Sequence, residues 1–216
     1  MKKHIAILDP FPRTLKLIFS KDKFKALKSR YNLIYAPKKY KKNFYDKNIH
    51  KASFIIGQPD LPKDLLIKAK KLKAVINVES NFMNNMDYQY CFKKGIHVIA
   101  TSPVFSKPVA EIALGMTLSL IRNIHTAHSD FIKGKEKYGL ESNHNAYLLS
   151  GKKIGLLGFG DLAKSLYPLL LPFTKDINVY DPWIPKINIQ NLGFKSISLN
   201  KMFESCEVIY VLATVT

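Results

Sequence analysis

The stretch that decides the fold runs from Lys153 to Asp181 and reads KIGLLGFGDLAKSLYPLLLPFTKDINVYD. Its first five residues, Lys153 to Leu157, predict a strand, and apolar residues at helical spacing follow the glycines. Asp176 to Tyr180 predicts a second strand, which ends at Asp181. A strand, a glycine turn, a helix and a second strand in this order predict a βαβ unit of a parallel sheet.

The small residues of this stretch fit a dinucleotide-binding turn. Gly158 permits a tight turn out of the strand, Gly160 lets the backbone approach a pyrophosphate, and Ala163 allows the helix to lie close to the sheet. Backbone N–H groups at the start of the helix present donors to an anion. Asp181 is placed to accept hydrogen bonds from the adenosine ribose. The candidate cofactor-binding residues are therefore Gly158, Phe159, Gly160, Asp161, Leu162, Asp181 and Pro182.

The predicted cofactor is NAD, not NADP. The negative charge of Asp181 would repel the extra phosphate of NADP, and no arginine follows Asp181 in the sequence. The alternative is an ordinary αβ turn whose glycines serve packing alone. The agreement of strand, helix and strand-end aspartate favours the dinucleotide.

Upstream, a first block alternates strand-like with helix-like runs and predicts a flavodoxin-like, doubly wound parallel sheet. The predicted strands are His4 to Leu8, Leu33 to Tyr35, Ser53 to Ile56, Ala74 to Val78 and His97 to Ala100. The predicted helices are Thr14 to Lys28, Lys63 to Lys71 and Asn84 to Lys93. The polar, basic segment from Ala36 to Lys51 is expected to be a loop.

A further helix is predicted after Thr101-Ser102-Pro103, with Ser106 as its cap and Pro108 in its first turn. From Val109 to Ile121 it is apolar nearly all round, which predicts burial on both sides, between domains, at a subunit interface, or both. The longest run that suggests a membrane span, Ile112 to Ile121, is far shorter than the roughly 20 residues required. No signal peptide is evident, so we expect a soluble cytoplasmic protein.

The composition is that of a basic globular protein: 34 Lys and Arg stand against 16 Asp and Glu, a formal net charge of +18. Such a charge raises the possibility of nucleic-acid binding. Only Arg13, Arg30 and Arg122 are arginines, however, and arginine is preferred for forked contacts to phosphates and bases. A lysine-rich solvated surface is therefore favoured over nucleic-acid binding. No metal site is predicted, because the two cysteines, Cys91 and Cys206, do not have a metal-ligand spacing.

Several motifs together resemble the D-isomer-specific 2-hydroxyacid dehydrogenases. The coenzyme domain of that family is similar to GKKIGLLGFGDLAKSL from Gly151, VYDPW from Val179 and FESCEVIYVL from Phe203. NNMDYQYCFKKGIHV from Asn84 and PVAEIAL from Pro108 resemble the family's preceding helices and strand. The resemblance covers most of the chain after about Ala74.

The resemblance implies an NAD-dependent oxidoreductase that acts on a 2-hydroxy or 2-keto acid, usually as a homodimer. Residues 1–103 would be the N-terminal part of the substrate domain, and residues 104–216 an NAD-binding Rossmann domain, incomplete at its C-terminal side. The family's substrate-binding arginine, its catalytic histidine and that histidine's acidic partner follow the third coenzyme-domain strand, here Val208 to Leu212. We therefore expect an N-terminal portion without these groups and assign no catalytic role to His4, His50, His97, His125, His128 or His144.

The loop after Ala74 to Val78 departs from the family. A glycine-rich turn whose amides receive the substrate carboxylate is typical there, whereas this chain has Glu79, Ser80 and Asn81. These three residues are the candidate substrate-binding positions, and an ordinary polar loop is the alternative. Glu79 would disfavour an anionic substrate unless it points away. A second hypothesis for the whole protein is an NAD-binding sensor or corepressor-like protein without catalysis.

Overall fold

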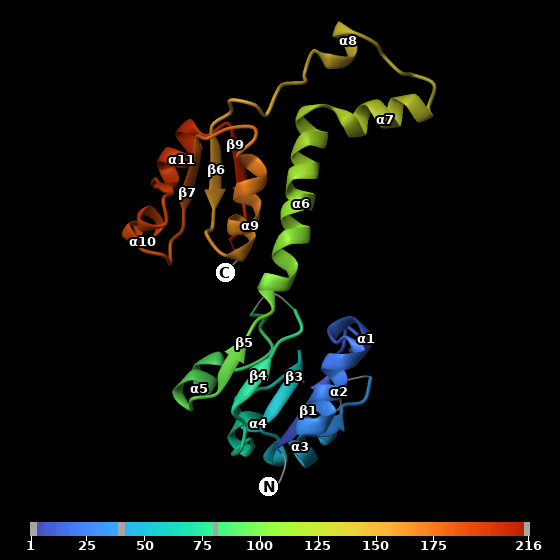
Figure 1. Cartoon of the computed structure of the whole chain (residues 1–216), viewed down its shortest axis with the longest axis vertical. Helices are drawn as coiled ribbons and strands as arrows, with labels where there is room; N and C mark the ends of the chain where they lie inside the picture. The colour runs from blue at the N-terminus through green and yellow to red at the C-terminus, as the bar shows by residue number, and fades with distance from the viewer. Residues whose placement is uncertain (1–3, 39–41, 80–81, 214–216) are drawn as a thin grey trace. The chain divides into compact units, whose positions relative to one another are not determined.

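The computed structural model describes residues 4–38, 42–79 and 82–213, and the chain divides into two compact units (Figure 1). The first unit is Met1–Ser102 and the second is Pro103–Thr216. Each unit has its own parallel sheet and its own hydrophobic core. The assignment of a substrate role to the first unit and a coenzyme role to the second stays a prediction.

The first unit contains a five-stranded parallel sheet in the order β2-β1-β3-β4-β5. This order is that of flavodoxin-like folds, so the predicted fold class is confirmed. The strands lie within one or two residues of their predicted positions: β1 Ile5–Asp9, β2 Asn32–Tyr35, β3 Phe54–Gly57, β4 Ala74–Ile76 and β5 His97–Ile99.

One helix prediction in the first unit was wrong. The single helix expected over Thr14 to Lys28 is two helices, α1 Leu15–Ile18 and α2 Lys21–Arg30. The break occurs because Phe19 and Ser20 are extended and the Ser20 hydroxyl caps α2 by accepting from the Lys23 amide. The other two predicted helices are present, as α4 Lys63–Lys68 and α5 Tyr88–Lys93.

The segment expected to be a loop, Ala36 to Lys51, contains α3 Lys42–Asn48 and the 3-10 turn η1 Ile49–Lys51. Its polar composition hid two core residues, Tyr45 and Ile49, which are fully buried against the sheet. The Tyr45 hydroxyl donates a 2.7 Å hydrogen bond to Oδ2 of Asp9 at the end of β1. Burial of these two side chains stabilises α3, whose other residues are mostly polar and therefore did not predict a helix.

The second unit contains a four-stranded parallel sheet in the order β8-β7-β6-β9. Its strands are β6 Ile154–Leu157, β7 Ile177–Tyr180, β8 Lys195–Ser196 and β9 Val208–Val211. If the four strands are numbered 1 to 4 along the chain, their order across the sheet is 3-2-1-4. This is the Rossmann arrangement, so the predicted fold class is confirmed. The sequence analysis did not predict the short β8. The strand predicted as the third of this sheet, Val208 to Leu212, is therefore its fourth, β9.

The helices of the second unit are α6 Ser102–Ile121, α7 Ile124–Ile132, α8 Leu140–Asn143, α9 Asp161–Leu170, α10 Lys186–Asn191 and α11 Leu199–Ser205. Figure 1 shows the long α6 joined to α7 by a sharp turn, where Asn123 has a φ of 55°. The prediction that Ser106 caps α6 was wrong. The helix begins four residues earlier, and the Ser106 hydroxyl donates to the Pro103 carbonyl from inside it.

Burial on both sides of α6 is not observed within the chain. Ala110 and Ile121 lie in the second core, whereas Ile112, Met116 and Leu120 are 60%, 68% and 66% exposed. Because it starts at Ser102, α6 is long and apolar enough to cross a membrane by length and composition, with a mean hydropathy of 1.4. One such helix is a weak indication, and the inner face of α6 packs on the Rossmann sheet core.

Candidate dinucleotide site

The turn after β6 requires glycine at position 158 for two independent reasons. Gly158 has a φ of 97°, a conformation that side chains disfavour. A Cβ atom there would also lie 2.8 Å from the backbone nitrogen of Ala213, just after β9. The strand order reverses between β6 and β9, so this glycine lies at the switch point where Rossmann folds bind their ligands.

Gly160 differs from Gly158 in its surroundings. A Cβ added to Gly160 would meet no heavy atom within 4 Å, and its φ of −81° suits any residue. Gly160 is the N-cap of α9, and no side chain caps this end of the helix. Open space in front of a helix N-terminus is what a pyrophosphate requires, since the first-turn amides then face the anion.

The other members of the turn lie at the start of α9. Asp161 and Leu162 form its first turn and are half-buried, while Phe159 and Ala163 are fully buried in the second core. The Phe159 ring packs edge-on against Phe194 with centroids 4.6 Å apart. Ala163 therefore serves packing, as predicted for the third small position, and Phe159 contributes only its backbone to the site.

Asp181 lies directly after β7 and binds three backbone amides. Its Oδ2 accepts from Phe159 N at 2.7 Å, and its Oδ1 accepts from Trp183 N at 2.8 Å and Ile184 N at 3.0 Å. The structure thus brings Asp181 onto the glycine turn, as the sequence predicts for a ribose-binding carboxylate. The Phe159 amide is engaged by Asp181, so it is not free to donate to another group.

Pro182 and Trp183 follow Asp181 at the same edge and are both exposed. Trp183, the single tryptophan of the chain, is 82% exposed and was not among the predicted site residues. An indole this exposed is unusual, because tryptophan normally buries much of its large apolar surface. The exposure of Trp183 beside Asp181 marks it as a further candidate residue of this site, and the sequence alone does not show that exposure.

Of the predicted substrate residues, only Glu79 can be placed, because Ser80 and Asn81 lie outside the described residues. Glu79 forms a forked ion pair with Arg13, with distances of 2.7 Å to Nε and 3.0 Å to Nη2. This pairing lowers the pKa of Glu79 through the Arg13 hydrogen bond and charge, against a smaller opposing effect of burial. Sequence reasoning missed Arg13, although it is one of only three arginines in the chain.

The histidines do not form a catalytic constellation in the described part of the chain. All six are exposed. Their described hydrogen bonds run to hydroxyls or backbone carbonyls, as for His4 with Ser53 and His144 with the Glu141 carbonyl. No group of three or more His, Cys, Asp or Glu among the described residues is arranged to hold a metal ion.

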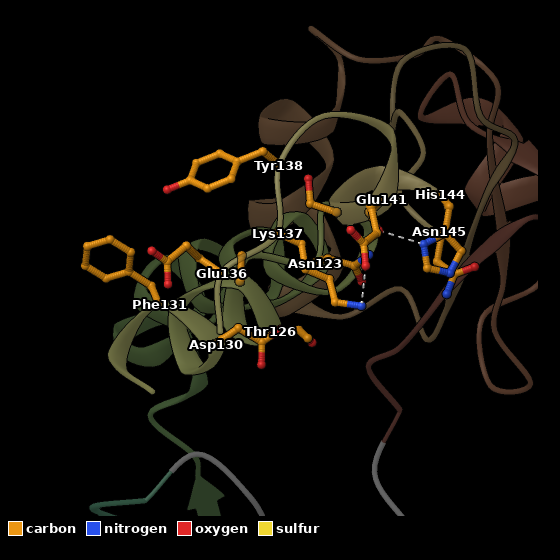
Figure 2. Close-up of a pocket in the computed structure, with 12 residues that line it drawn as sticks. Asn123, Thr126, Asp130, Phe131, Glu136, Lys137, Tyr138, Glu141, His144 and Asn145 are labelled. Atoms are coloured by element: carbon orange, nitrogen blue, oxygen red, sulfur yellow. Dashed lines mark hydrogen bonds and ion pairs between the residues drawn. The ribbon is translucent and has the colours of Figure 1, made fainter. Parts of the chain in front are cut away.

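A cavity of about 470 Å³ lies elsewhere in the second unit, between α7, α8 and the loop that joins them (Figure 2). Carboxylates of Asp130, Glu136 and Glu141 line it, and Glu141 is paired with Lys137 at 2.8 Å. None of the predicted site residues borders this cavity. The carboxylates of this cavity would repel the phosphates of a dinucleotide, whereas the glycine turn offers backbone donors and open space at Gly160.

The 3-2-1-4 sheet, the glycine turn at its switch point and the carboxylate at the end of β7 define a dinucleotide-binding α/β protein. Residues 114–216 match the model of the D-isomer specific 2-hydroxyacid dehydrogenase NAD binding domain. This match confirms NAD as the cofactor of the domain.

Similar proteins agree with the match. Hydroxypyruvate reductase of Thermotoga maritima is 31% identical over 147 residues, covering 68% of this chain and 45% of the relative. D-3-phosphoglycerate dehydrogenase of Methanocaldococcus jannaschii is 30% identical over 152 residues, covering 68% of this chain and 28% of the relative. The crystal structure of a phosphoglycerate oxidoreductase from Rhizobium etli superposes with a TM-score of 0.80 at 40% identity, covering 97% of this chain and 66% of that one.

The chain belongs to the D-isomer-specific 2-hydroxyacid dehydrogenase family. It spans less than half the length of these two curated relatives.

Proposed function

We propose that this chain binds NAD(H) on the turn from Gly158 to Leu162 and takes part in the oxidation of a 2-hydroxy acid or the reduction of a 2-keto acid. The observation that carries the proposal is the juxtaposition of Asp181 with the turn, through the 2.7 Å bond from Phe159 N. Bound NAD+ would accept the hydride in the oxidation, and bound NADH would donate it in the reduction. The chain's own residues bind and orient the dinucleotide.

Each site residue has a separate role in this proposal. Gly158 holds the turn in shape, and Gly160 leaves room for the pyrophosphate. The first-turn amides of Asp161 and Leu162 donate to the phosphate oxygens. Asp181 accepts from a ribose hydroxyl through Oδ2, which keeps one acceptor site beside the bond from Phe159 N, whereas both sites of Oδ1 are taken by Trp183 N and Ile184 N. Pro182 borders the adenosine end.

The proposed substrate class follows from the family and its named members. Hydroxypyruvate is a 2-keto acid, and 3-phosphoglycerate is a 2-hydroxy acid. We place the substrate at the carboxyl edge of the sheet in the first unit, near Glu79, Ser80 and Asn81. The carboxyl ends of parallel strands are where such sheets bind ligands.

We propose that the family's catalytic arginine, acid and histidine are not supplied by the residues described here. The exposure of all six histidines supports this, because a catalytic imidazole is normally oriented by a carboxylate. The chain would then bind cofactor and acid without turnover of its own.

The test is calorimetric titration of the purified chain with NAD, NADP and NADH. We expect saturable binding of NAD and NADH, weaker binding of NADP, and loss of binding in Asp181→Ala. Asp60→Ala removes one exposed carboxylate of the first unit and serves as the charge-matched control. A folded chain that binds none of the three nucleotides would overturn the proposal.

The second candidate function, an NAD-dependent sensor or corepressor-like protein, is favoured by the same absence of an oriented histidine among the described residues. It predicts NAD binding that changes association with a protein partner, with no turnover at any substrate concentration. Turnover that appears in a longer form of the protein would rule it out.

We also propose a soluble cytoplasmic homodimer that binds neither membrane nor nucleic acid. The exposed stripe of Ile112, Met116 and Leu120, spaced one helical turn apart, supports a second copy on this face of α6. Sedimentation velocity of Met116→Glu should show a monomer where the parent chain shows a dimer. Salt-sensitive binding to duplex DNA would contradict the nucleic-acid part of this proposal.

A further inference from the structure

The ion pair of Arg13 with Glu79 spans the carboxyl edge of the first sheet. Arg13 lies in the loop after β1, and Glu79 lies in the loop after β4. In the strand order these two strands flank β3, so the pair joins loops on either side of the end of β3. The order of strands reverses between β1 and β3, which is the switch point where such sheets bind ligands.

Glu79 is bonded to three other loops at this edge. Besides Arg13, its backbone amide donates a 3.4 Å hydrogen bond to Oε1 of Gln58, directly after β3. Its carbonyl accepts from the Thr101 hydroxyl at 3.2 Å and from the Thr101 amide at 3.4 Å, beyond the end of β5. Glu79 thus ties together the loops that follow β1, β3 and β5.

Polar groups without partners lie beside this junction. Nε2 of Gln58 and both side-chain polar atoms of Asn77 are buried with no hydrogen-bond partner in the described part of the chain. Buried amides of this kind are costly and are normally satisfied by protein, water or a ligand. The edge is therefore polar beyond the ion pair itself.

The ion pair is accessible to a small molecule, because the Arg13 and Glu79 side chains are 40% and 24% exposed. An ionised carboxylate at a ligand-binding edge repels an anionic ligand, and Coulomb repulsion at a few ångström is substantial even near a protein surface. The forked contact from Arg13 places a positive charge on that carboxylate at 2.7 Å. The pair carries no net charge toward an approaching acid.

We infer that Arg13 is a specificity-determining positioning residue, which neutralises Glu79 and so permits an anionic 2-keto acid to bind at this edge. The inference rests on the proposed function, because it takes the acid to bind in the first unit. It explains how Glu79 is accommodated in a loop that is typically a glycine-rich turn in the family. The role of Arg13 is exerted through Glu79, with no contact to the reacting atoms required.

The experiment compares pyruvate with pyruvamide, its uncharged counterpart, in calorimetric titrations of the NADH-loaded chain. Arg13→Gln should weaken pyruvate binding about two- to fivefold, the range of surface ion-pair effects, and leave pyruvamide unchanged. Arg13→Lys should lose less, since it keeps the charge but not the fork. The double variant Arg13→Gln/Glu79→Gln should restore pyruvate binding, because it removes the uncompensated carboxylate.

Lys68→Gln is the matched control. Lys68 also forms an ion pair in the first unit, with Asp46 at 2.6 Å, and its removal changes the net charge equally. The control matters because residues 1–102 hold 22 Lys and Arg against 7 Asp and Glu, which attract any anion. Equal losses in Lys68→Gln and Arg13→Gln would therefore overturn the inference.

Two further outcomes would also overturn it. If the double variant binds pyruvate no better than Arg13→Gln, or if pyruvamide binding falls equally, Arg13 has a purely structural role. If the parent chain binds NADH but no pyruvate, the proposal that the acid binds at the carboxyl edge of the first sheet is wrong. The inference about Arg13 then fails as well, while the proposed nucleotide site stands. Circular dichroism of each variant distinguishes these results from unfolding.

Discussion

The backbone amide of Phe159 donates a 2.7 Å hydrogen bond to Oδ2 of Asp181, which joins the turn after β6 to the end of β7. The same carboxylate accepts the amides of Trp183 and Ile184. Asp181 therefore has a structural task that exists before any nucleotide binds. A residue of this kind is preorganised for its ligand, because its position is fixed by the backbone on both sides.

The first prediction concerns this structural task. Asp181→Ala should lower the free energy of unfolding by about 1 to 2 kcal/mol, because the backbone amide of the buried Phe159 loses its hydrogen-bond acceptor. Urea denaturation followed by circular dichroism measures the change, with Asp60→Ala as a control expected to be neutral. An unchanged midpoint in Asp181→Ala would show that the backbone bonds contribute nothing measurable.

The two glycines of the turn should respond differently to alanine. Gly158→Ala should destabilise the second unit by about 1 to 3 kcal/mol, because a side chain is forced into a positive φ. Gly160→Ala should leave stability nearly unchanged, since its Cβ enters open space. The space it fills is that of the pyrophosphate, so NAD affinity should fall at least tenfold. Equal stability losses in both variants would contradict the assignment.

Trp183 offers an intrinsic probe of the nucleotide site. It is the single tryptophan and lies two residues from Asp181, so NADH binding should quench its fluorescence. Asp181→Ala should retain the emission but lose the NADH-dependent change, and Trp183→Phe should remove the emission. NADH binding detected by calorimetry without any change in Trp183 emission would place the nucleotide elsewhere.

Asp9 predicts a pH dependence of stability in the first unit. Burial raises the pKa of this carboxyl above its usual value, and the hydrogen bond from Tyr45 opposes the rise. A carboxyl with a raised folded-state pKa contributes stability at low pH, and that contribution is lost as pH rises through the folded-state pKa. Asp9→Asn should therefore stabilise the chain more at pH 7 than at pH 4 relative to the parent.

Thermal unfolding at the two pH values tests this dependence on Asp9. The control is Asp60→Asn, at an exposed carboxyl of the same unit. A stabilisation by Asp9→Asn that is the same at both pH values would show that Asp9 does not titrate between them.

Sequence reasoning failed where a residue's environment is set by distant segments. Tyr45 stands in a basic, polar stretch that predicts a loop, yet it is buried because the sheet places Asp9 and the core beside it. Ser106 has the residue type of a helix cap, but α6 begins at Ser102 and encloses it. Local propensity is a weak prior, and tertiary packing overrides it at such positions.

What the sequence alone determined is the periodic and local part of the protein. Alternating strand and helix patterns predicted two parallel sheets, and the spacing of Gly158, Gly160 and Asp181 predicted the nucleotide turn. Both follow from near-neighbour geometry, since a glycine turn between a strand and a helix needs only residues close in the chain.

The tertiary structure alone decided which charges meet. Arg13 and Glu79 are 66 residues apart, and nothing in their local sequence indicates that they pair. They meet because β1 and β4 both lie beside β3 and end at the same edge of the sheet. The strand order, which is set by burying apolar surface on both faces of the sheet, turned an apparently unfavourable Glu79 into a neutralised one.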